Sequence, residues 1–501
     1  MRKLANGGIT PLVFFTRRLS AVKRTKSIRF NIILNVIRQC CNILFPLITY
    51  PYISRVLGAT NLGKYSFADS IIQYFMIVAT LGVTGYAVRE GARIRDDKEK
   101  LVSFSAEIFG VNIISLVTSL LIMLASIFFV PRLFDNRVLL LILSLNIVFT
   151  VIGREWVNLI YEDVWFVTLR YIVFQVLALV FLFAFVKDKN DYVIYTWIMV
   201  FSISGAQIIN VIRTNKYVPL RIAFTQNTYK HIKPIMFMFC ISAATVIYVN
   251  SDVTILGILR SESEVGIYYM VGKIYTLCKT LLNAIITVIT PRVAYYIGIG
   301  KEREYKNLLN ITKKGLITLI IPCVVGLFML SDNVISIISS EEFITGVSAL
   351  RILCVAMLFA VFGCYYSQVV LIPNRCEKGF LVATVVSATV NIGLNFIFIP
   401  IYGISGAAVT TVVAEIIVFI VCFMYSSKYI KHVFDRELVP VVAGAVGIMF
   451  VCYMIKKLNF SIFFESVLAI VSSIIVYVFI QVLLKNSCLL KVIQDMKEMK
   501  K

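Results

Sequence analysis

The stretch from Pro51 to Tyr65 reads Pro-Tyr-Ile-Ser-Arg-Val-Leu-Gly-Ala-Thr-Asn-Leu-Gly-Lys-Tyr, and parts of it return about 200 residues later. Leu57-Gly58 recurs as Leu256-Gly257, and Gly63-Lys64-Tyr65 recurs as Gly266-Ile267-Tyr268, with four extra residues between the two pairs. From there one offset of 203 residues maps five positions onto identical ones: Gly63, Tyr65, Arg89, Lys98 and Glu99 onto Gly266, Tyr268, Arg292, Lys301 and Glu302. A chance match in so apolar a chain is the alternative. We interpret the constant offset as an internal duplication.

The composition around this repeat is that of a polytopic membrane protein. Of 501 residues, 59% are hydrophobic and 15% are charged, whereas soluble domains carry about 25% charged residues. Apolar runs near the ~20 residues that a bilayer requires fall at about 31–52, 66–88, 105–130, 138–160, 165–186, 192–213, 234–258, 267–290, 315–331, 346–372, 379–400, 404–426, 438–455 and 463–484. The sequence therefore predicts an all-α fold with about 14 transmembrane helices.

The repeat divides these helices into lobes. We expect a basic cytosolic segment at 1–29, an N-lobe of helices 1–6 at 30–214 and a C-lobe of helices 7–12 at 234–430. A cytoplasmic inter-lobe loop is expected at 215–233, helices 13 and 14 at 431–486, and a basic cytosolic tail at 487–501. Because each copy has an even number of helices, the lobes should relate by an axis normal to the membrane and face each other across a central space.

The net charge of +22 is placed asymmetrically. With the N-terminus inside, 36 of the 49 Lys and Arg residues fall on the inner side and ten on the outer side. This asymmetry predicts that both termini are cytoplasmic. No aromatic-basic module interrupts the apolar runs, so nucleic acid is not an expected partner.

Several kinds of chemistry have no sequence support. The eleven cysteines form no C-x-x-C pair, and His231 and His432 stand alone in basic loops, which argues against metal sites and Cys/His catalysis. The chain has no G-x-x-x-x-G-K-[ST] loop, and no cofactor is expected. A membrane glycosyltransferase or glycan polymerase would usually have a long outer loop, whereas the longest one expected here has about 14 residues, 331–345. We therefore expect no enzyme.

Polar residues on the four helices related by the duplication gather on one face of each helix. At 100° per residue, the faces carry Asn31, Asn35, Arg38, Asn42 and Thr49 on helix 1; Asp69, Gln73, Thr80 and Thr84 on helix 2; Ser242, Thr245 and Asp252 on helix 7; and Lys273, Thr276, Thr280, Asn283 and Thr287 on helix 8. A charge at bilayer depth costs about 2.5 to 3.5 kcal/mol unless it meets water or a partner. The simplest arrangement surrounds one central cavity, although single Asn, Ser and Thr residues also hold helices together.

Each of the remaining charges has more than one interpretation. Lys279 points at another angle from Lys273 and can pair elsewhere, and Glu415 is either half of a helix-helix ion pair or a proton site. Asp69 and Glu107 are expected near helix ends, solvated or acting as caps. Arg55 should lie near the outer mouth or extend to lipid headgroups. The predicted substrate path comprises Arg38, Asn42, Arg55, Asp69, Asp252, Lys273, Lys279 and Asn283, with Asp252 and Glu415 as possible coupling-ion residues.

A weakly positive cavity would admit an anionic headgroup. An anion that moves outward along an inside-negative potential gains about 2.3 kcal/mol per charge per 100 mV. The charges alone therefore suggest both a substrate class and an energy source.

The motifs resemble those of the Wzx-type flippases of O-antigen and polysaccharide repeat units. The resemblance rests on Pro51–Gly58 with Gly63-Lys64-Tyr65; Arg89-Glu90 and Arg95-Asp96-Asp97-Lys98; Glu155-Trp156 with Glu162-Asp163 and Arg170; Asn250-Ser251-Asp252 with Leu256-Gly257; Pro291-Arg292; and Gly403–Ala408 with Glu415. It covers about residues 30–430. Arg154 departs from the pattern, since members often have an apolar residue there.

The resemblance implies the fold of the multidrug, oligosaccharidyl-lipid and polysaccharide exporter superfamily, in the bacterial inner membrane. It implies an undecaprenyl-diphosphate-linked oligosaccharide as substrate, moved to the outer leaflet by alternating access, with Arg38, Lys273 and Lys279 neutralising phosphate. A polysaccharide polymerase and a chain-length regulator are implied as partners. Two alternatives stay open: a cation-coupled multidrug exporter using Asp69, Asp252 or Glu415, and a flippase of peptidoglycan precursors.

Overall fold

The computed structural model describes residues 28–430, 438–487, 489 and 490. Within these ranges it is helical, and the predicted all-α fold of two six-helix lobes and two further helices is confirmed. Twelve helical segments there are long and apolar enough to cross a membrane. Two of them are broken, at Gly58 and Gly403, which gives fourteen helical segments of spanning length in the described ranges. The terminal segments predicted to be basic and cytosolic, with His432, lie almost wholly outside the described ranges.

The helices follow one another with short connections. The N-lobe contains α2 (Ile28–Thr80), α3 (Val83–Arg93), α4 (Lys98–Phe129), α5 (Pro131–Asp135), α6 (Arg137–Gly153), α7 (Glu155–Ile160), α8 (Val164–Phe185), η2 (Lys189–Asp191), α9 (Tyr192–Val200), η3 (Phe201–Gly205) and α10 (Ala206–Tyr217). The C-lobe contains α11 (Thr228–Leu259), α12 (Glu262–Gly298), α13 (Glu302–Met329), α14 (Ser331–Ile338), η4 (Glu341–Gly346), α15 (Val347–Cys364), η5 (Tyr365–Leu371) and α16 (Glu377–Ser426). The last two helices are α17 (Leu438–Lys456) and α18 (Ile462–Leu483).

The connection between helices 1 and 2 differs from the prediction. The residues between the apolar runs 31–52 and 66–88 were expected to form an outer connection, but they are helical, and the chain turns only at Gly58. Gly58 has φ 71°, a conformation that a glycine adopts without a Cβ clash. A single residue can therefore replace a loop, and the helices on both sides continue to the turn.

The two copies of the repeat are built alike. The break at Gly58 corresponds, at the offset of 203, to Ser261, which separates α11 from α12 and accepts a capping hydrogen bond from the Glu264 backbone N–H. The repeated Lys-Glu pairs lie at the starts of α4 and α13. Local sequence at equivalent positions thus ends and starts equivalent helices.

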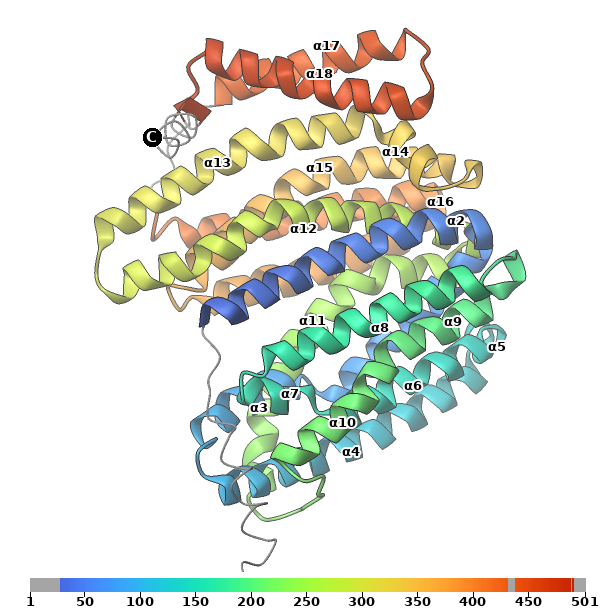
Figure 1. The fold of residues 1–501 in the computed structure, drawn as a ribbon, viewed down its shortest axis with the longest axis vertical. Helices are drawn as coiled ribbons and strands as arrows, with labels where there is room; N and C mark the ends of the chain where they lie inside the picture. The colour runs from blue at the N-terminus through green and yellow to red at the C-terminus, as the bar shows by residue number, and fades with distance from the viewer. Residues whose placement is uncertain (1–27, 431–437, 488, 491–501) are drawn as a thin grey trace, which may run out of the picture.

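The two lobes meet where the equivalent helices cross. A Cβ added to Gly63 would overlap the Glu262 carbonyl, and one added to Gly266 would overlap the Ala59 carbonyl. Since 59 and 262 also differ by 203, the contact is symmetric. Figure 1 shows the first part of α2 running between the bodies formed by the two copies, with α17 and α18 at one edge beyond α13.

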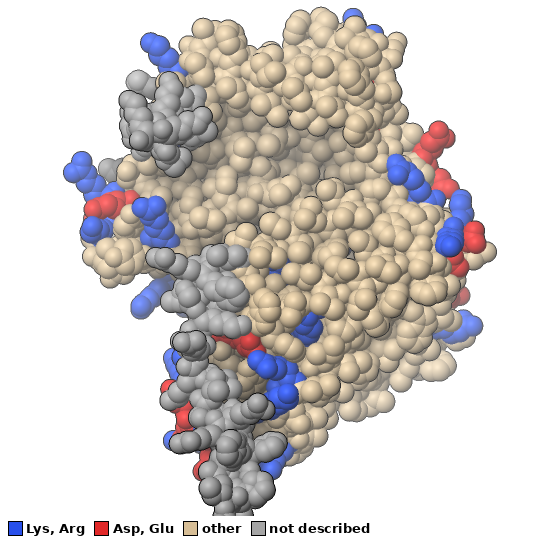
Figure 2. Space-filling view, viewed as in Figure 1, with Lys and Arg blue, Asp and Glu red and all other residues tan. Residues whose placement is uncertain are grey.

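Charged side chains gather at two opposite ends of the molecule, with a broad band of other residues between them (Figure 2). We call the end with Gly58 and Ser261 the closed end and the end with Lys98 and Lys301 the basic end. Among the described side chains, α2 has no buried one between Leu34 and Ile53, and α11 has none between Ile235 and Ser251. The equivalent helices are therefore buried at the closed end and exposed toward the basic end.

Candidate functional site

Lys273 on α12 lies at the junction of the lobes. Its Nζ lies close enough to the Tyr50 hydroxyl and the Asp69 carboxylate, both on α2 of the other lobe, for electrostatic interaction. It also lies 4.7 Å from the centroid of the Tyr269 ring. We call Tyr50, Asp69, Tyr195, Tyr269 and Lys273 the Lys273 cluster. It places one cation and one anion from different lobes at the same depth of a membrane protein.

Polar contacts between the lobes continue from this cluster to the closed end. Thr254 of α11 donates to the Ser70 hydroxyl of α2 at 3.0 Å and contacts the Tyr74 hydroxyl at 3.1 Å. At the closed end itself, Glu342 of η4 accepts from the Ala59 backbone N–H and from Lys189, each at 3.0 Å. These contacts, with the Gly63 and Gly266 crossing, hold the lobes together at this end.

Asp252 on α11 lies in a polar cluster inside the C-lobe. Its Oδ1 accepts from Asn395 at 2.7 Å, and its Oδ2 accepts from Tyr268 at 2.8 Å and from Thr411 at 2.6 Å. Asn391 joins through Ser251 and Asn395. Asp252 is 8% exposed, so this Asp252 cluster replaces water around a carboxylate with hydroxyl and amide groups.

Lys279 and Glu415 form an ion pair in the same lobe. The Lys279 Nζ lies 2.6 Å from the Glu415 Oε1, which also accepts from the Tyr275 hydroxyl at 3.1 Å. The exposed fractions of the two side chains are 27% and 5%. Lys279 therefore differs from Lys273 in having its neutralising partner within its own lobe.

Arg38 lies on the N-lobe side, close enough to Arg170 and Tyr171 for electrostatic interaction. The helical rise places it about 18 Å along helix 1 from Tyr50, toward the basic end. The structure thus does not bring Arg38 and Lys273 together, but places them at different depths. Arg38 is half-buried, whereas Asn42, one turn away, is exposed.

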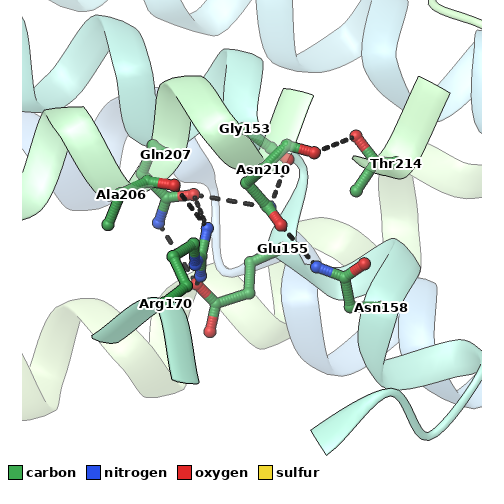
Figure 3. A network of polar contacts seen from close by, with 8 residues as sticks. All are labelled: Gly153, Glu155, Asn158, Arg170, Ala206, Gln207, Asn210 and Thr214. Atoms are coloured by element: carbon green, nitrogen blue, oxygen red, sulfur yellow. Dashed lines mark hydrogen bonds and ion pairs between the residues drawn. The ribbon is translucent and has the colours of Figure 1, made fainter. Parts of the chain in front are cut away.

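Arg170 belongs to a polar network at the basic end of the N-lobe (Figure 3). Its guanidinium lies 2.6 Å from the Glu155 Oε2 and donates to the Ala206 carbonyl at 3.0 Å and to Gln207 at 3.2 Å. Asn210 donates to the Gly153 carbonyl and accepts from Asn158. We call this the Arg170 network. It joins α6, α7, α8 and α10, and its Arg170 is the residue that lies close to Arg38.

Other predicted residues lie apart from these clusters. Arg55 is exposed at the closed end and donates to the Ile337 carbonyl at 2.5 Å. Asn283 lies on α12 toward the basic end, and its Oδ1 is buried without a hydrogen-bond partner among the described residues. The side chains of Asn31 and Asn35 lie outside the described part.

Two expectations are wrong. Asp69 and Glu107 were expected near helix ends, but Asp69 lies within α2 and Glu107 within α4, where Glu107 is 5% exposed. His231 does not stand alone, since its Nε2 lies 3.1 Å from Glu107 and its Nδ1 lies 2.7 Å from the Tyr86 hydroxyl. The helices extend well past the apolar runs, so residues that end a run do not end a helix.

Sequence reasoning missed the uncharged residues that surround the predicted charges. Tyr50, Tyr195, Asn395 and Thr411 carry no charge and match no spacing, and their contacts join helices far apart in the chain. Tyr268 was matched only as a position of the repeat, without a role. Arg170 and Glu155 were quoted as motif residues without a role. The two residues have opposite charges and lie 15 residues apart in the quoted motifs, and this was the signal that could have predicted their ion pair.

Two family models each match more than half of the chain. The family model "Polysaccharide biosynthesis protein" matches residues 28–297, and the model "Lipid II flippase MurJ" matches residues 172–479. A relative from Escherichia coli (strain K12), described as "Putative O-antigen transporter", is 24% identical over 405 residues, which cover 80% of this chain and 96% of the relative.

Solved structures share the fold. A structure of the lipid II flippase MurJ in an inward closed conformation covers 91% of this chain and 99% of its own, with a TM-score of 0.74 and 16% identity. An inward-facing multidrug resistance transporter of the MATE family covers 79% of this chain and 97% of its own, with a TM-score of 0.64 and 16% identity. At these identities the likeness concerns the fold alone.

Proposed function

Because the chain belongs to the polysaccharide biosynthesis protein family and to the lipid II flippase MurJ family, we propose that it is a flippase for lipid-linked oligosaccharides. The substrate we propose is an undecaprenyl-diphosphate-linked repeat unit of O-antigen or a related surface polysaccharide, moved across the bacterial inner membrane. The Lys273 cluster carries the proposal, because a membrane-buried cation between two lobes can meet an anionic headgroup that crosses between them.

The basic end faces the cytoplasm in this proposal, with both termini on that side, because it carries most of the Lys and Arg residues. The closed end then faces outward. The headgroup enters from the exposed basic-end halves of helices 1 and 7, and the prenyl chain stays in lipid at a gap between the lobes. A polysaccharide polymerase and a chain-length regulator would use the product outside.

The cationic groups would bind the diphosphate at different depths. Arg38 meets the diphosphate first, near the basic end, and Lys273 meets it deeper, at the junction of the lobes. Asn42 and Asn283 offer hydrogen bonds to sugar hydroxyls along the way. Lys279 is neutralised by Glu415, so it would contribute only where a substrate phosphate displaces that carboxylate, and Arg55 would act at the outer mouth.

Asp252 is the better candidate for coupling to an ion. Its cluster supplies carboxylate, amide and hydroxyl oxygens, which suit either a proton or a hard cation, whereas Glu415 is already occupied by Lys279. Asp252→Asn should therefore remove any dependence of transport on sodium or proton gradients in vesicles. The Asp252→Asn variant should retain transport driven by the membrane potential alone.

Surface polysaccharide in a strain that lacks the gene tests the function. We expect the wild-type gene to restore the polymer, and Arg38→Ala or Lys273→Ala to lower it at least about tenfold, the effect of some 1.4 kcal/mol, with normal amounts of protein in the membrane. Lys378→Ala, an exposed lysine of the C-lobe, is the control. Normal polymer in both test variants would contradict the electrostatic role.

A second candidate substrate is a peptidoglycan precursor, favoured by the match of the MurJ model to residues 172–479. The same strain distinguishes it. Loss of a peptidoglycan flippase should stop growth, whereas loss of a surface-glycan flippase should remove polymer from cells that still grow.

A further inference from the structure

A cavity lies on the flank of the N-lobe, apart from the Lys273 and Asp252 clusters. Its volume is about 650 Å³, within the range of about 300 to 1,000 Å³ of small-molecule sites. The apolar lining comes from Val78 and Leu81 near the end of α2, Val111 and Ile114 of α4, Phe224 of the inter-lobe segment and Ile232 of α11. One wall therefore belongs to the first helix of the other lobe.

The segment that forms the rim is held in place by polar contacts. The Ala223 N–H donates to the Ala106 carbonyl at 3.2 Å, and Thr225 donates to Glu107 at 2.9 Å. His231 holds the other oxygen of the same carboxylate. These contacts hold the segment and the start of α11 with three large side chains exposed: Ile222, Phe224 and Tyr229 are 54%, 59% and 75% exposed.

The rim is basic as well as apolar. The sequence has no Asp or Glu between Asp191 and Asp252, and Glu107, the carboxylate that reaches this segment, is buried. Lys230 and Lys233 are exposed on the first turns of α11. Lys233 lies about 40° around the helix from the lining residue Tyr229. Lys230 lies about 100° from Tyr229, and its Nζ donates to the Asn227 Oδ1 at 2.7 Å. An anionic group above the cavity would therefore meet Lys233 directly and Lys230 through its electrostatic field.

The depth of the cavity fits one leaflet. The apolar run of α4 begins at about residue 105, and the lining reaches Thr118, about 20 Å further along the helix. Half of the hydrocarbon core measures about 15 Å. In the orientation proposed above, an apolar chain in this cavity would extend from the cytoplasmic interface to about mid-bilayer.

We propose that this cavity binds an anionic phospholipid of the cytoplasmic leaflet, with one acyl chain between α4 and α11 and its phosphate beside Lys230 and Lys233. The bound lipid fills the seam between the lobes where helix 2 meets helix 7. There a Cβ on Gly82 would lie 3.0 Å from the Met238 carbonyl. The site is separate from the proposed substrate path and does not depend on which glycan is carried.

Native mass spectrometry of the purified full-length protein, titrated with phosphatidylglycerol or phosphatidylcholine, tests the site. We expect a preference for phosphatidylglycerol that Lys230→Ala/Lys233→Ala weakens about 30-fold, as expected for two surface cations. Lys378→Ala/Lys428→Ala, two exposed lysines of the C-lobe, should leave the preference unchanged.

The acyl-chain part has its own pair of variants. Ile114→Trp fills the cavity and should lower retention of phosphatidylglycerol, whereas Val117→Trp, equally exposed on α4 but outside the lining, should not. Equal retention by all four variants would overturn the proposal. So would undecaprenyl phosphate as the sole lipid retained, because the cavity would then belong to the carrier lipid.

Discussion

Membrane-buried charges in this chain are neutralised in two ways, and the difference separates transport from packing. Lys273 faces Asp69 and Tyr50 across the lobe junction, so lobe motion changes its surroundings. Lys279 is paired with Glu415 inside one lobe, and lobe motion leaves that pair intact. The two lysines lie six residues apart on one helix, which makes them a matched pair for separating the two roles.

Breaking the Lys279–Glu415 pair should destabilise the protein more than deleting it. Glu415→Ala leaves an ammonium in the membrane, and loss of one partner of a buried pair costs about 3 to 5 kcal/mol. Lys279→Met/Glu415→Leu removes both charges and should recover most of that loss. Thermal unfolding of the purified variants measures the difference. If the loss of stability in the double variant equals the sum of the losses in the two single variants, the pair is not coupled.

Arg154 shows what a charge costs without such a partner. It is 1% exposed, with φ 46°, and it donates one hydrogen bond, to the Val218 carbonyl at 3.3 Å. Its guanidinium lies 5.4 Å from the centroid of the Phe109 ring. Nε and Nη1 have no hydrogen-bond partner among the described residues. The family that the motifs resemble often has an apolar residue at this position. Such a residue would not bury unpaired hydrogen-bond donors, which cost free energy.

At the scale of the helix, the crossing of α2 and α12 depends on the absence of two side chains. Gly63→Ala and Gly266→Ala each place a methyl group against backbone, which cannot move as a flexible side chain can. We expect the closed end to open in both variants. Gly272→Ala on the same helix meets nothing within 4 Å and is the control.

Opening can be measured at Thr254, which lies buried just inside the closed end. In a background without the chain's own cysteines, Thr254→Cys should react slowly with an impermeant maleimide added from outside. Gly63→Ala should raise that rate severalfold, and Gly272→Ala should not. Equal rates in all three proteins would mean that the crossing does not control access.

For the whole molecule, the sequence predicted what depends on local pattern. Apolar runs predicted the helices, and an offset of 203 residues predicted the two lobes. The offset made Gly63 and Gly266 equivalent positions, but it did not predict that they meet where the lobes cross. It did not predict that Gly58 alone would turn the chain, because a φ of 71° leaves no trace beyond the glycine itself. Two of the three partners of Asp252, Asn395 and Thr411, lie 143 and 159 residues away, and the periodicity of a single helix cannot predict them.

Alternating access requires that the two lobes separate at the closed end once per cycle. The Lys189–Glu342 pair joins the lobes there, with Nζ and Oε1 3.0 Å apart and both side chains exposed. A short cleavable cross-linker between Lys189→Cys and Glu342→Cys should therefore stop transport, and cleavage should restore it. The Arg95–Glu162 pair has the same kind of contact, at 2.9 Å, but lies within the N-lobe.

Cross-linked Arg95→Cys/Glu162→Cys should keep its transport activity, because both residues move with one lobe. Each double variant without the cross-linker controls for loss of the ion pair. Flipping of a lipid-linked oligosaccharide in proteoliposomes is the measurement, read against the fraction of cross-linked protein. If fully cross-linked Lys189→Cys/Glu342→Cys still transports, the lobes do not have to part at this end, and the headgroup must cross by another route than the junction at Lys273.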